Sequence, residues 1–331
     1  MTPTHPNDTW LDAELKTIDL GDTRLNQRLK QVLGALAARP NDSIPAALGG
    51  RHELKAAYRL IDNDNVTPEK ILKPHFDATT QRCQTQKVVL YAQDTTELDF
   101  TRPQQQVHRA GPLDGTSRWG ALLHLNHAFS EDGLPLGAVS AKLWSRDTPH
   151  AEQTKLTRAE KRKKTRATPI EQKESFRWLE GVRATQEIAH QCADTLCVSI
   201  CDSEGDIYDL LAFERTADNF HYLIRACQDR VVLDQQGDSC VLRASLEPLP
   251  VLFSYDITVR ARKAKVSCET RSRRSTRVSR QATVEVRAGT MTIQAPKVSK
   301  LAVRSVCVNA VMVREVNPPK GEVPVEWSGF Y

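Results

Sequence analysis

Two aspartates follow segments that have the composition of buried strands. Residues 87–93 are mostly apolar and lead into Asp94, and residues 196–201 lead into Asp202 in the same way. Carboxylate oxygens are the ligands that Mg²⁺ prefers, and paired metal-bound carboxylates suit metal-assisted phosphoryl transfer. The pattern therefore indicates a site for a divalent cation. The alternatives are an ordinary turn role for Asp94 and a helix-capping role for Asp202.

The composition is that of an ordinary folded protein. Of the 331 residues, 40% are hydrophobic and 26% are charged, and the net charge is +5. This excess is small, so binding to a polyanion would depend on local clusters of Lys and Arg. No apolar stretch approaches the roughly 18 residues of a membrane span, and the N-terminus lacks a signal-peptide pattern. We therefore expect a cytoplasmic, nucleoid-associated protein without a membrane segment.

The eight cysteines do not have the spacing of a structural zinc site. Cys192, Cys197 and Cys201 lie closest together, but the sequence has no Cys-x2-Cys pair, and no histidine follows at ligand distance. Buried, reduced thiols are the expected state in a cytoplasmic chain.

The first eighty or so residues have helical periodicity. Apolar residues recur at helical spacing after Asp22, a suitable N-cap, and Thr67 followed by Pro68 predicts the start of a further helix. Basic residues lie between the apolar positions: Arg24, Arg28, Lys30, Arg51, Lys55 and Arg59. A solvated helix face is the usual role of such charges, but a basic helical bundle also suits contact with duplex phosphates.

From residue 87 onward the patterns favour strands. Residues 121–130 and 134–144 flank Glu131-Asp132-Gly133, a turn signal, and predict a hairpin. Residues 145–172 are expected to form an exposed loop or frayed helix, and residues 174–194 a long helix. Residues 196–201 and 220–226 are expected to form strands, with a helix at 206–216 between them. Several strands, a crossover helix and acids at strand ends favour an α/β core of the ribonuclease-H-like type.

Residues 228–316 have short alternating apolar runs and no helical signal, which predicts a β-rich insertion. A dense basic segment lies within it: Arg260, Arg262, Lys263, Lys265, Arg271, Arg273, Arg274, Arg277 and Arg280. An exposed hairpin tip and a phosphate-binding segment both fit this charge.

Six separated motifs occur in one order along the chain: Leu20–Leu25, Ala56–Ile61, Gln93–Thr96, Leu143–Arg146 with Lys173–Trp178, Cys201–Tyr208, and Asn317–Trp327. In this order they resemble bacterial insertion-sequence transposases of the insertion-sequence-four family, close to the transposon-five group. The resemblance covers nearly the whole chain. It implies four regions: a small all-α end-binding domain at 1–82, a ribonuclease-H-like core at 83–227, the β-rich insertion at 228–316, and the start of the last core strand at 317–331.

The resemblance implies cut-and-paste DNA transposition by an enzyme of the DDE class. In that class, two aspartates and one glutamate hold Mg²⁺ or Mn²⁺, and Asp94 and Asp202 match the two aspartates. Arg225 matches an arginine that contacts transposon-end DNA, and Trp327 matches a tryptophan that stacks on a flipped base.

The partners implied are double-stranded DNA, as transposon terminal inverted repeats and as target DNA, and a second copy of the chain. Arg24 and Arg28 lie in the part that resembles the end-binding domain, so we expect them to contact DNA.

One part of the family pattern is missing from the sequence. In the family, the last core strand leads to a helix with a Tyr-x2-Arg-x3-Glu-x6-Lys signature, whose glutamate is the third metal ligand. Here four residues follow Trp327, and one of them is glycine, which weakens a strand. We therefore expect a disrupted last strand and an inactive chain, truncated by a frameshift or early stop, without the triad glutamate or the dimerisation region.

Two other functions stay open from the sequence. The chain fits a non-catalytic, transposon-end DNA-binding inhibitor of a full-length transposase. It also fits a generic metal-dependent nuclease in which two acids suffice.

Overall fold

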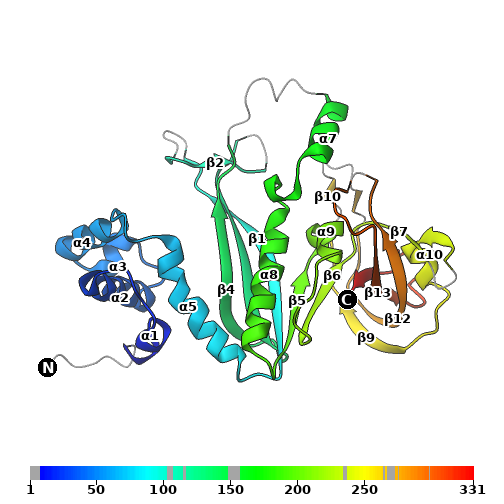
Figure 1. Ribbon diagram of the computed structural model, residues 1–331, viewed down its shortest axis with the longest axis horizontal. Helices are drawn as coiled ribbons and strands as arrows, with labels where there is room; N and C mark the ends of the chain where they lie inside the picture. The colour runs from blue at the N-terminus through cyan, green and yellow to red at the C-terminus, as the bar shows by residue number, and fades with distance from the viewer. Residues whose placement is uncertain are drawn as a thin grey trace. The chain divides into compact units, whose positions relative to one another are not determined.

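The structure is a computed structural model, shown in Figure 1. It describes residues 8–102, 107–114, 117–147, 157–233, 237–263, 265–266, 273–274, 276–297 and 299–331. Parts of two sequence predictions lie outside these residues, namely residues 148–156 of the polar stretch at 145–172 and Arg271 of the basic segment. The chain forms two compact units, residues 1–145 with 184–197 and residues 146–183 with 198–331.

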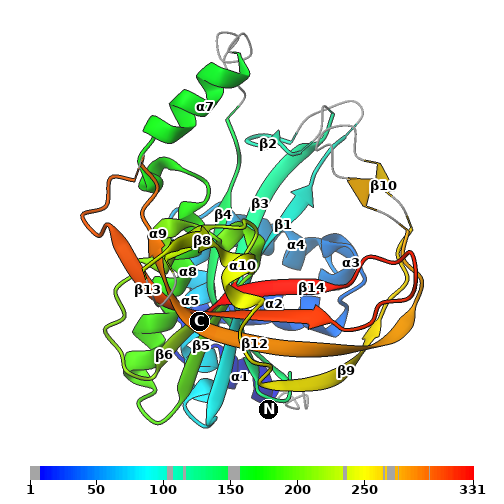
Figure 2. The same cartoon turned by 90° about the vertical axis from the view of Figure 1, so that its right-hand side faces the viewer.

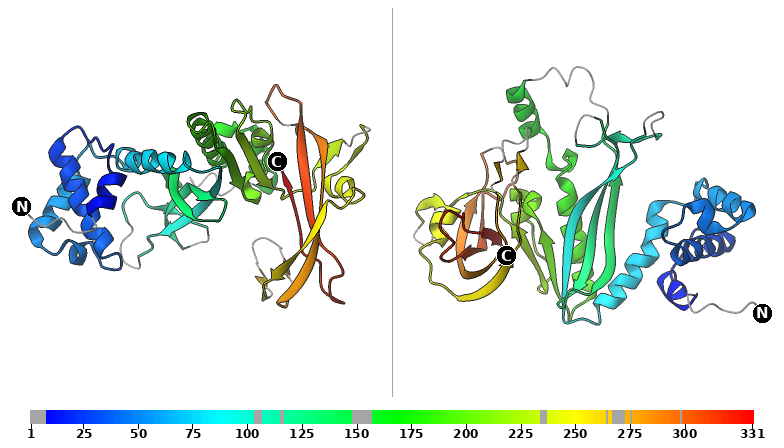
Figure 3. Two further views of the ribbon diagram at one scale, coloured as in Figure 1. Left: turned by 90° about the horizontal axis from the view of Figure 1, so that it is seen from below. Right: turned by 180° about the vertical axis from the view of Figure 1, so that it is seen from behind.

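The first unit begins with helices, which are blue in Figure 3. They are α1 (Asp8–Glu14), α2 (Thr23–Ala38), α3 (Ile44–Leu48), α4 (Arg51–Ile61) and α5 (Pro68–Cys83). Asp22 caps α2 by accepting the backbone N–H of Arg24 at 2.8 Å, and Thr67 caps α5. Both predicted helix starts are confirmed. The bundle has a buried apolar core of Leu20, Leu29, Val32, Leu48, Ala57 and Leu60.

Antiparallel strands follow in the same unit: β1 (Val88–Asp99), β2 (Gly111–Pro112), β3 (Trp119–Ser130) and β4 (Pro135–Trp144). β3 pairs with β1, β2 and β4, and the predicted hairpin turn lies between Ser130 and Pro135. Helix α5 packs on β4, where Arg82 Nε donates to the Leu136 carbonyl at 2.6 Å. The start of β5 (Leu196–Cys201) extends this sheet, because the Leu196 N–H donates to the Lys87 carbonyl at 2.8 Å.

The boundaries between the two units fall within helix α8 (Phe176–Gln191) and within strand β5, so each unit contains a part of both elements. The other helices of the second unit are α7 (Arg158–Ala167), α9 (Tyr208–Leu211) and α10 (Leu242–Leu246), with the 3₁₀ turns Ile170–Gln172 and Ser203–Gly205. Of the helix predicted over 206–216, only the single turn of α9 is present, so the predicted length is wrong. The chain there forms a 3₁₀ turn and one helical turn, and Asp206 is buried between them.

The strands of the second unit are β6 (Phe220–Arg225), β7 (Val231–Leu233), β8 (Ser239–Val241), β9 (Phe253–Val259), β10 (Lys265–Val266), β11 (Arg273–Arg274), β12 (Arg280–Gln294), β13 (Ser305–Glu315) and β14 (Glu326–Phe330). One sheet has the order β6-β14-β13-β12-β7-β8, with β9 also paired to β12. The strand-rich character expected for 228–316 is present. Helix α10 is the exception there, and it buries Leu242 and Leu246.

The expected disruption of the last strand is wrong. Figure 2 shows β14 beside β13, and β14 also pairs with β6 on its other side. Gly329 lies where β14 approaches β6 too closely for a side chain, because a Cβ at this position would be 2.9 Å from the Ile224 carbonyl oxygen. Phe330 is fully buried. Glycine therefore permits this strand pairing instead of weakening it.

Candidate functional site

Asp94 lies in the middle of β1, not at the end of a strand. The strand continues to Asp99 because its pairing with β3 continues, with Asp94 opposite Leu125 and Asp99 opposite Gly120. The Asp94 side chain is exposed, and its Oδ1 accepts the N–H of Thr95 at 2.8 Å. The carboxylate is therefore accessible from solvent on a fixed, hydrogen-bonded strand.

Asp202 directly follows β5 and is also exposed. Its Oδ1 accepts the Glu204 N–H at 2.8 Å and so caps the short 3₁₀ turn. The neighbouring acids have structural partners: Glu204 pairs with Arg177, and fully buried Asp206 pairs with Arg230 at 2.7 Å. Glu204 is also exposed, so Asp202 differs from both neighbouring acids in having no ion pair with an arginine among those described.

Each of the two aspartates has donor chemistry that suits Mg²⁺ or Mn²⁺. Asp94 belongs to the first unit and Asp202 to the second. Within the described ranges, no three or more His, Cys, Asp or Glu side chains form a group that would hold a metal ion. The shared metal site stays a prediction from the sequence.

Arg225 and Trp327 are brought together in the second unit. They line one cavity of about 310 Å³. The cavity exists because β6 pairs with β14, with Gly329 opposite Arg225 and the Ala226 N–H donating to the Ser328 carbonyl at 2.8 Å. Trp327 is 37% exposed, so part of its ring remains available to a ligand. An exposed indole beside a guanidinium suits stacking on a base next to a phosphate.

The same cavity is lined by residues that were not predicted from the sequence as site residues. Arg243 of α10 pairs with Glu326, and its backbone N–H donates to the Asp229 carboxylate at 2.9 Å. Gln228 also lines the cavity. No helix was expected within 228–316, so the sequence patterns did not place Arg243 of α10 near Trp327.

Arg24 and Arg28 both lie on α2, in the N-terminal helices. The Arg24 side chain is 89% exposed and pairs with Asp22 at 2.8 Å. Hydrogen bonds from Arg24 lower the pKa of the Asp22 carboxyl, so this N-cap stays anionic. Arg28 is half-buried. On α4, the side chains of Arg51, Lys55 and Arg59 are exposed at one-turn intervals.

The basic segment of the β-rich region has mixed roles. Arg260 and Lys263 are exposed, and Arg277 Nε donates to the Arg260 carbonyl at 3.1 Å. Arg280 is different, because its side chain is only 10% exposed and pairs with Glu315 and Glu322. Arg280 is therefore an internal ion-pair residue, and its inclusion among candidate phosphate contacts was wrong.

Comparison with known protein families identifies one region of the chain, the N-terminal helices. Residues 7–66 match the family described as transposase DNA-binding. The match spans helices α1 to α4, which carry the exposed basic residues. This supports a transposase or DNA-binding role for the chain.

The solved structures that are distantly similar to this chain include a transposase complex. It is a cryo-EM structure of a piggyBac transposase synaptic complex with hairpin DNA, at 9% sequence identity and a TM-score of 0.29. The match covers 98% of this chain and 55% of that chain, so this chain spans about half the length of that transposase. A likeness this weak carries no argument about fold or function.

None of the described helices is long and apolar enough to cross a membrane.

Proposed function

We propose that this chain is a DNA transposase of the insertion-sequence-four, transposon-five-like type, and that its N-terminal helices bind the ends of a DNA element. The observation that carries the proposal is the match of residues 7–66 to the transposase DNA-binding family, over helices with exposed cations on α2 and α4. Cations on helices contact duplex phosphates, and the released counterions make such binding dependent on salt.

The proposal extends to the metal-dependent chemistry of that family. Asp94 and Asp202 would each donate a carboxylate to Mg²⁺ or Mn²⁺ in a ribonuclease-H-like core. The bound ions would supply charge stabilisation and an activated nucleophile for phosphoryl transfer at a transposon end. Support comes from the exposed, acceptor-only chemistry of both side chains and from the order of strands and helices around them.

The cavity of Arg225 and Trp327 would then hold a base flipped out of the terminal duplex. The indole face would stack on the base, and Arg225 would contact the backbone phosphate beside it. The unpaired base would meet Gln228 and Asp229 at the cavity wall.

A second candidate function is that of a non-catalytic inhibitor, which would occupy the ends of the element through the N-terminal helices without cutting them. The match of residues 7–66 to the transposase DNA-binding family supports this candidate, because the match falls on the proposed binding region and not on the two aspartates.

The binding proposal is tested by fluorescence anisotropy with a duplex from the end of the element and a scrambled duplex. Arg24→Glu/Arg28→Glu should weaken binding and reduce its salt dependence, whereas Lys87→Glu/Lys320→Glu, at two exposed lysines elsewhere, should not. Trp327→Ala should weaken terminal binding by about 1–3 kcal/mol without changing the salt slope, because stacking releases no counterions. Equal effects of the two charge reversals would contradict the end-binding assignment.

The metal proposal has its own test. Asp94→Asn and Asp202→Asn should each weaken Mn²⁺ binding in calorimetric titrations, whereas Asp206→Asn should act on stability, because Asp206 is held internally by Arg230. Unchanged Mn²⁺ affinity in both variants, or robust metal-dependent cleavage of terminal DNA by this polypeptide, would overturn the corresponding part of the proposal.

A further inference from the structure

Helix α7 has an unusual charge content. Its ten residues include six Lys or Arg and one acid, Glu160. Glu160 is used at the helix N-terminus, where its carboxylate accepts the N–H and the hydroxyl of Thr157 at 2.8 and 2.7 Å. Like charges one turn apart destabilise an isolated helix, and α7 has no apolar face that would compensate. An anionic partner would relieve this repulsion.

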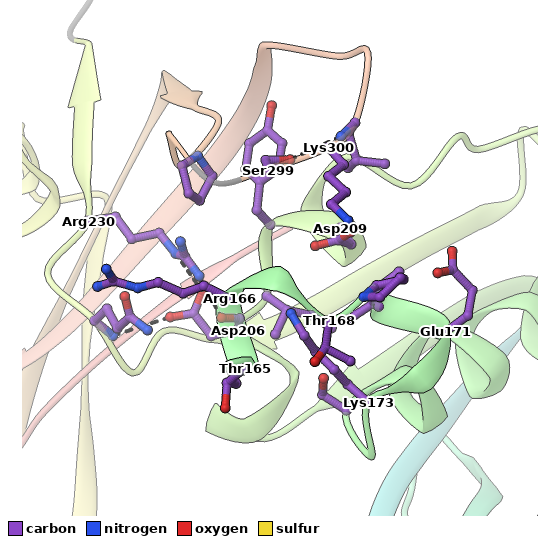
Figure 4. Close-up of a pocket in the computed structure, with 18 residues that line it drawn as sticks. Thr165, Arg166, Thr168, Glu171, Lys173, Asp206, Asp209, Arg230, Ser299 and Lys300 are labelled. Atoms are coloured by element: carbon purple, nitrogen blue, oxygen red, sulfur yellow. Dashed lines mark hydrogen bonds and ion pairs between the residues drawn. The ribbon is translucent and has the colours of Figure 1, made fainter. Parts of the chain in front are cut away.

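The C-terminal end of α7 borders a cavity of about 460 Å³ in the second unit. Figure 4 shows Arg166 and Lys300 among the side chains that line it. Lys300 comes from the loop after β12, and its Nζ donates to the Ala167 carbonyl at 3.2 Å. This bond attaches the loop to the end of α7 and places a further cation where the helix ends. Thr165, Thr168 and Ser299 add hydroxyl groups to the lining.

The acids of the cavity determine where the positive charge lies. Asp206 is neutralised internally, because it pairs with Arg230 and accepts the Cys227 N–H at 2.8 Å. Glu171 and Asp209 also line the cavity and oppose the charges of its remaining cations, Arg166, Lys173 and Lys300. The positive excess therefore lies on the α7 side, where Lys163, Lys164 and Arg166 are exposed.

The arrangement of these cations distinguishes between possible anions. Lys163 and Arg166 are three residues apart and lie on one exposed, convex face of the helix, so they present their charges along an open surface and not from the walls of a pocket. A single phosphate would need converging donors, whereas a polymer of phosphates meets cations spread along a helix. A nucleic-acid backbone fits this geometry best.

We propose that α7, together with the adjoining cavity rim at Arg166 and Lys300, binds the sugar–phosphate backbone of duplex DNA. This inference rests on the proposed function and adds a second contact region, separate from the N-terminal helices. We expect binding here to be independent of base sequence, because contacts to phosphates carry no sequence information.

The experiment compares two charge-matched variants of the full chain. Lys163→Gln/Arg166→Gln removes two α7 cations, and glutamine keeps a similar helix propensity. Lys87→Gln/Lys320→Gln removes two exposed lysines outside the site. Affinity for a random-sequence duplex is measured by anisotropy over a series of salt concentrations. Circular dichroism of both variants verifies that the fold is kept.

The α7 variant should lower the magnitude of the log K against log salt slope by about 1.8, since each lost phosphate contact contributes about 0.9. The control pair should leave the slope of the parent unchanged, and Lys300→Gln should lower it by about 0.9. If the parent binds DNA and responds to Arg24→Glu/Arg28→Glu but the α7 variant keeps the parental slope, this inference alone is overturned. If the parent binds no DNA, the proposed function fails with it.

Discussion

Glu315 at the end of β13 provides the sharpest test of how the second unit is held together. Its side chain is 2% exposed and accepts two hydrogen bonds from Arg280, from Nε and Nη2, each at 2.7 Å. It also accepts the backbone N–H of Val325 at 2.9 Å. Glu315→Ala would leave the buried Arg280 guanidinium with Glu322, at 3.2 Å, as its remaining ion-pair partner.

The magnitude follows from this burial. Removing one partner of a buried ion pair costs about 3–5 kcal/mol, because the other charge stays desolvated. Glu315→Gln keeps an acceptor for one hydrogen bond and should cost about 1–3 kcal/mol. The control Glu322→Gln changes a side chain that is 23% exposed and makes one longer contact, so it should cost less than about 1 kcal/mol.

The pH dependence gives an independent check. The hydrogen bond from Arg280 lowers the pKa of the Glu315 carboxyl, against the effect of burial, which raises it. A folded-state pKa below the ordinary value of 4.5 means that the stabilisation is complete above that value. The stabilisation is lost as the pH falls through the folded-state pKa. Glu315→Gln cannot titrate there, so it should lose less stability on acidification than the parent.

Urea unfolding, followed by tryptophan fluorescence at neutral and acidic pH, measures both effects. A cost below about 1 kcal/mol for Glu315→Ala would refute the buried-pair argument. The titration argument fails if Glu315→Gln and the parent lose equal stability on acidification.

Two further predictions concern other parts of the chain. Leu29→Ala should destabilise the helical bundle by about 2–5 kcal/mol, because Leu29 is 3% exposed in the core of the bundle. Leu25 is half-buried, so Leu25→Ala should cost less. Thermal unfolding measures both losses of stability, and equal losses would contradict the packing. Burial raises the pKa of Cys197 to about 11 and that of Cys192 to about 12, so iodoacetamide at mildly alkaline pH should label exposed Cys307 and spare both until the chain unfolds. Mass spectrometry of the labelled peptides decides this, and labelling of Cys197 as fast as Cys307 would count against it.

The features that the sequence predicted correctly depend on neighbouring residues. The cap side chains of Asp22 and Thr67 accept backbone N–H groups that lie within three residues of them, and the turn between β3 and β4 is formed by adjacent residues. The residues that form each cap and the turn are neighbours in the sequence, so the local sequence suffices to locate these features. The coarse mixed α/β character follows from the same local patterns.

The features that the sequence did not predict depend on distant partners. β1 continues past Asp94 because β3 offers a paired edge as far as Gly120, and the apolar pattern before Asp94 does not contain that information. β14 forms because β6 and β13 provide an edge on each side, which outweighs the low strand preference of Gly329. For the same reason, the sequence alone did not place Arg243 beside Trp327.

Glu315 also links the stability of the second unit to the candidate DNA-binding cavity. Its backbone N–H donates to the Val325 carbonyl while its carboxylate accepts the Val325 N–H, so one residue holds the two peptide groups on either side of Val325, directly before β14. This clamp sets the register in which Trp327 lies opposite Val313. A slip of one residue would turn Trp327 to the other face of the sheet, away from Arg225. Arg280 and Glu315 are therefore positioning residues for Trp327, although neither lines the cavity that it shares with Arg225.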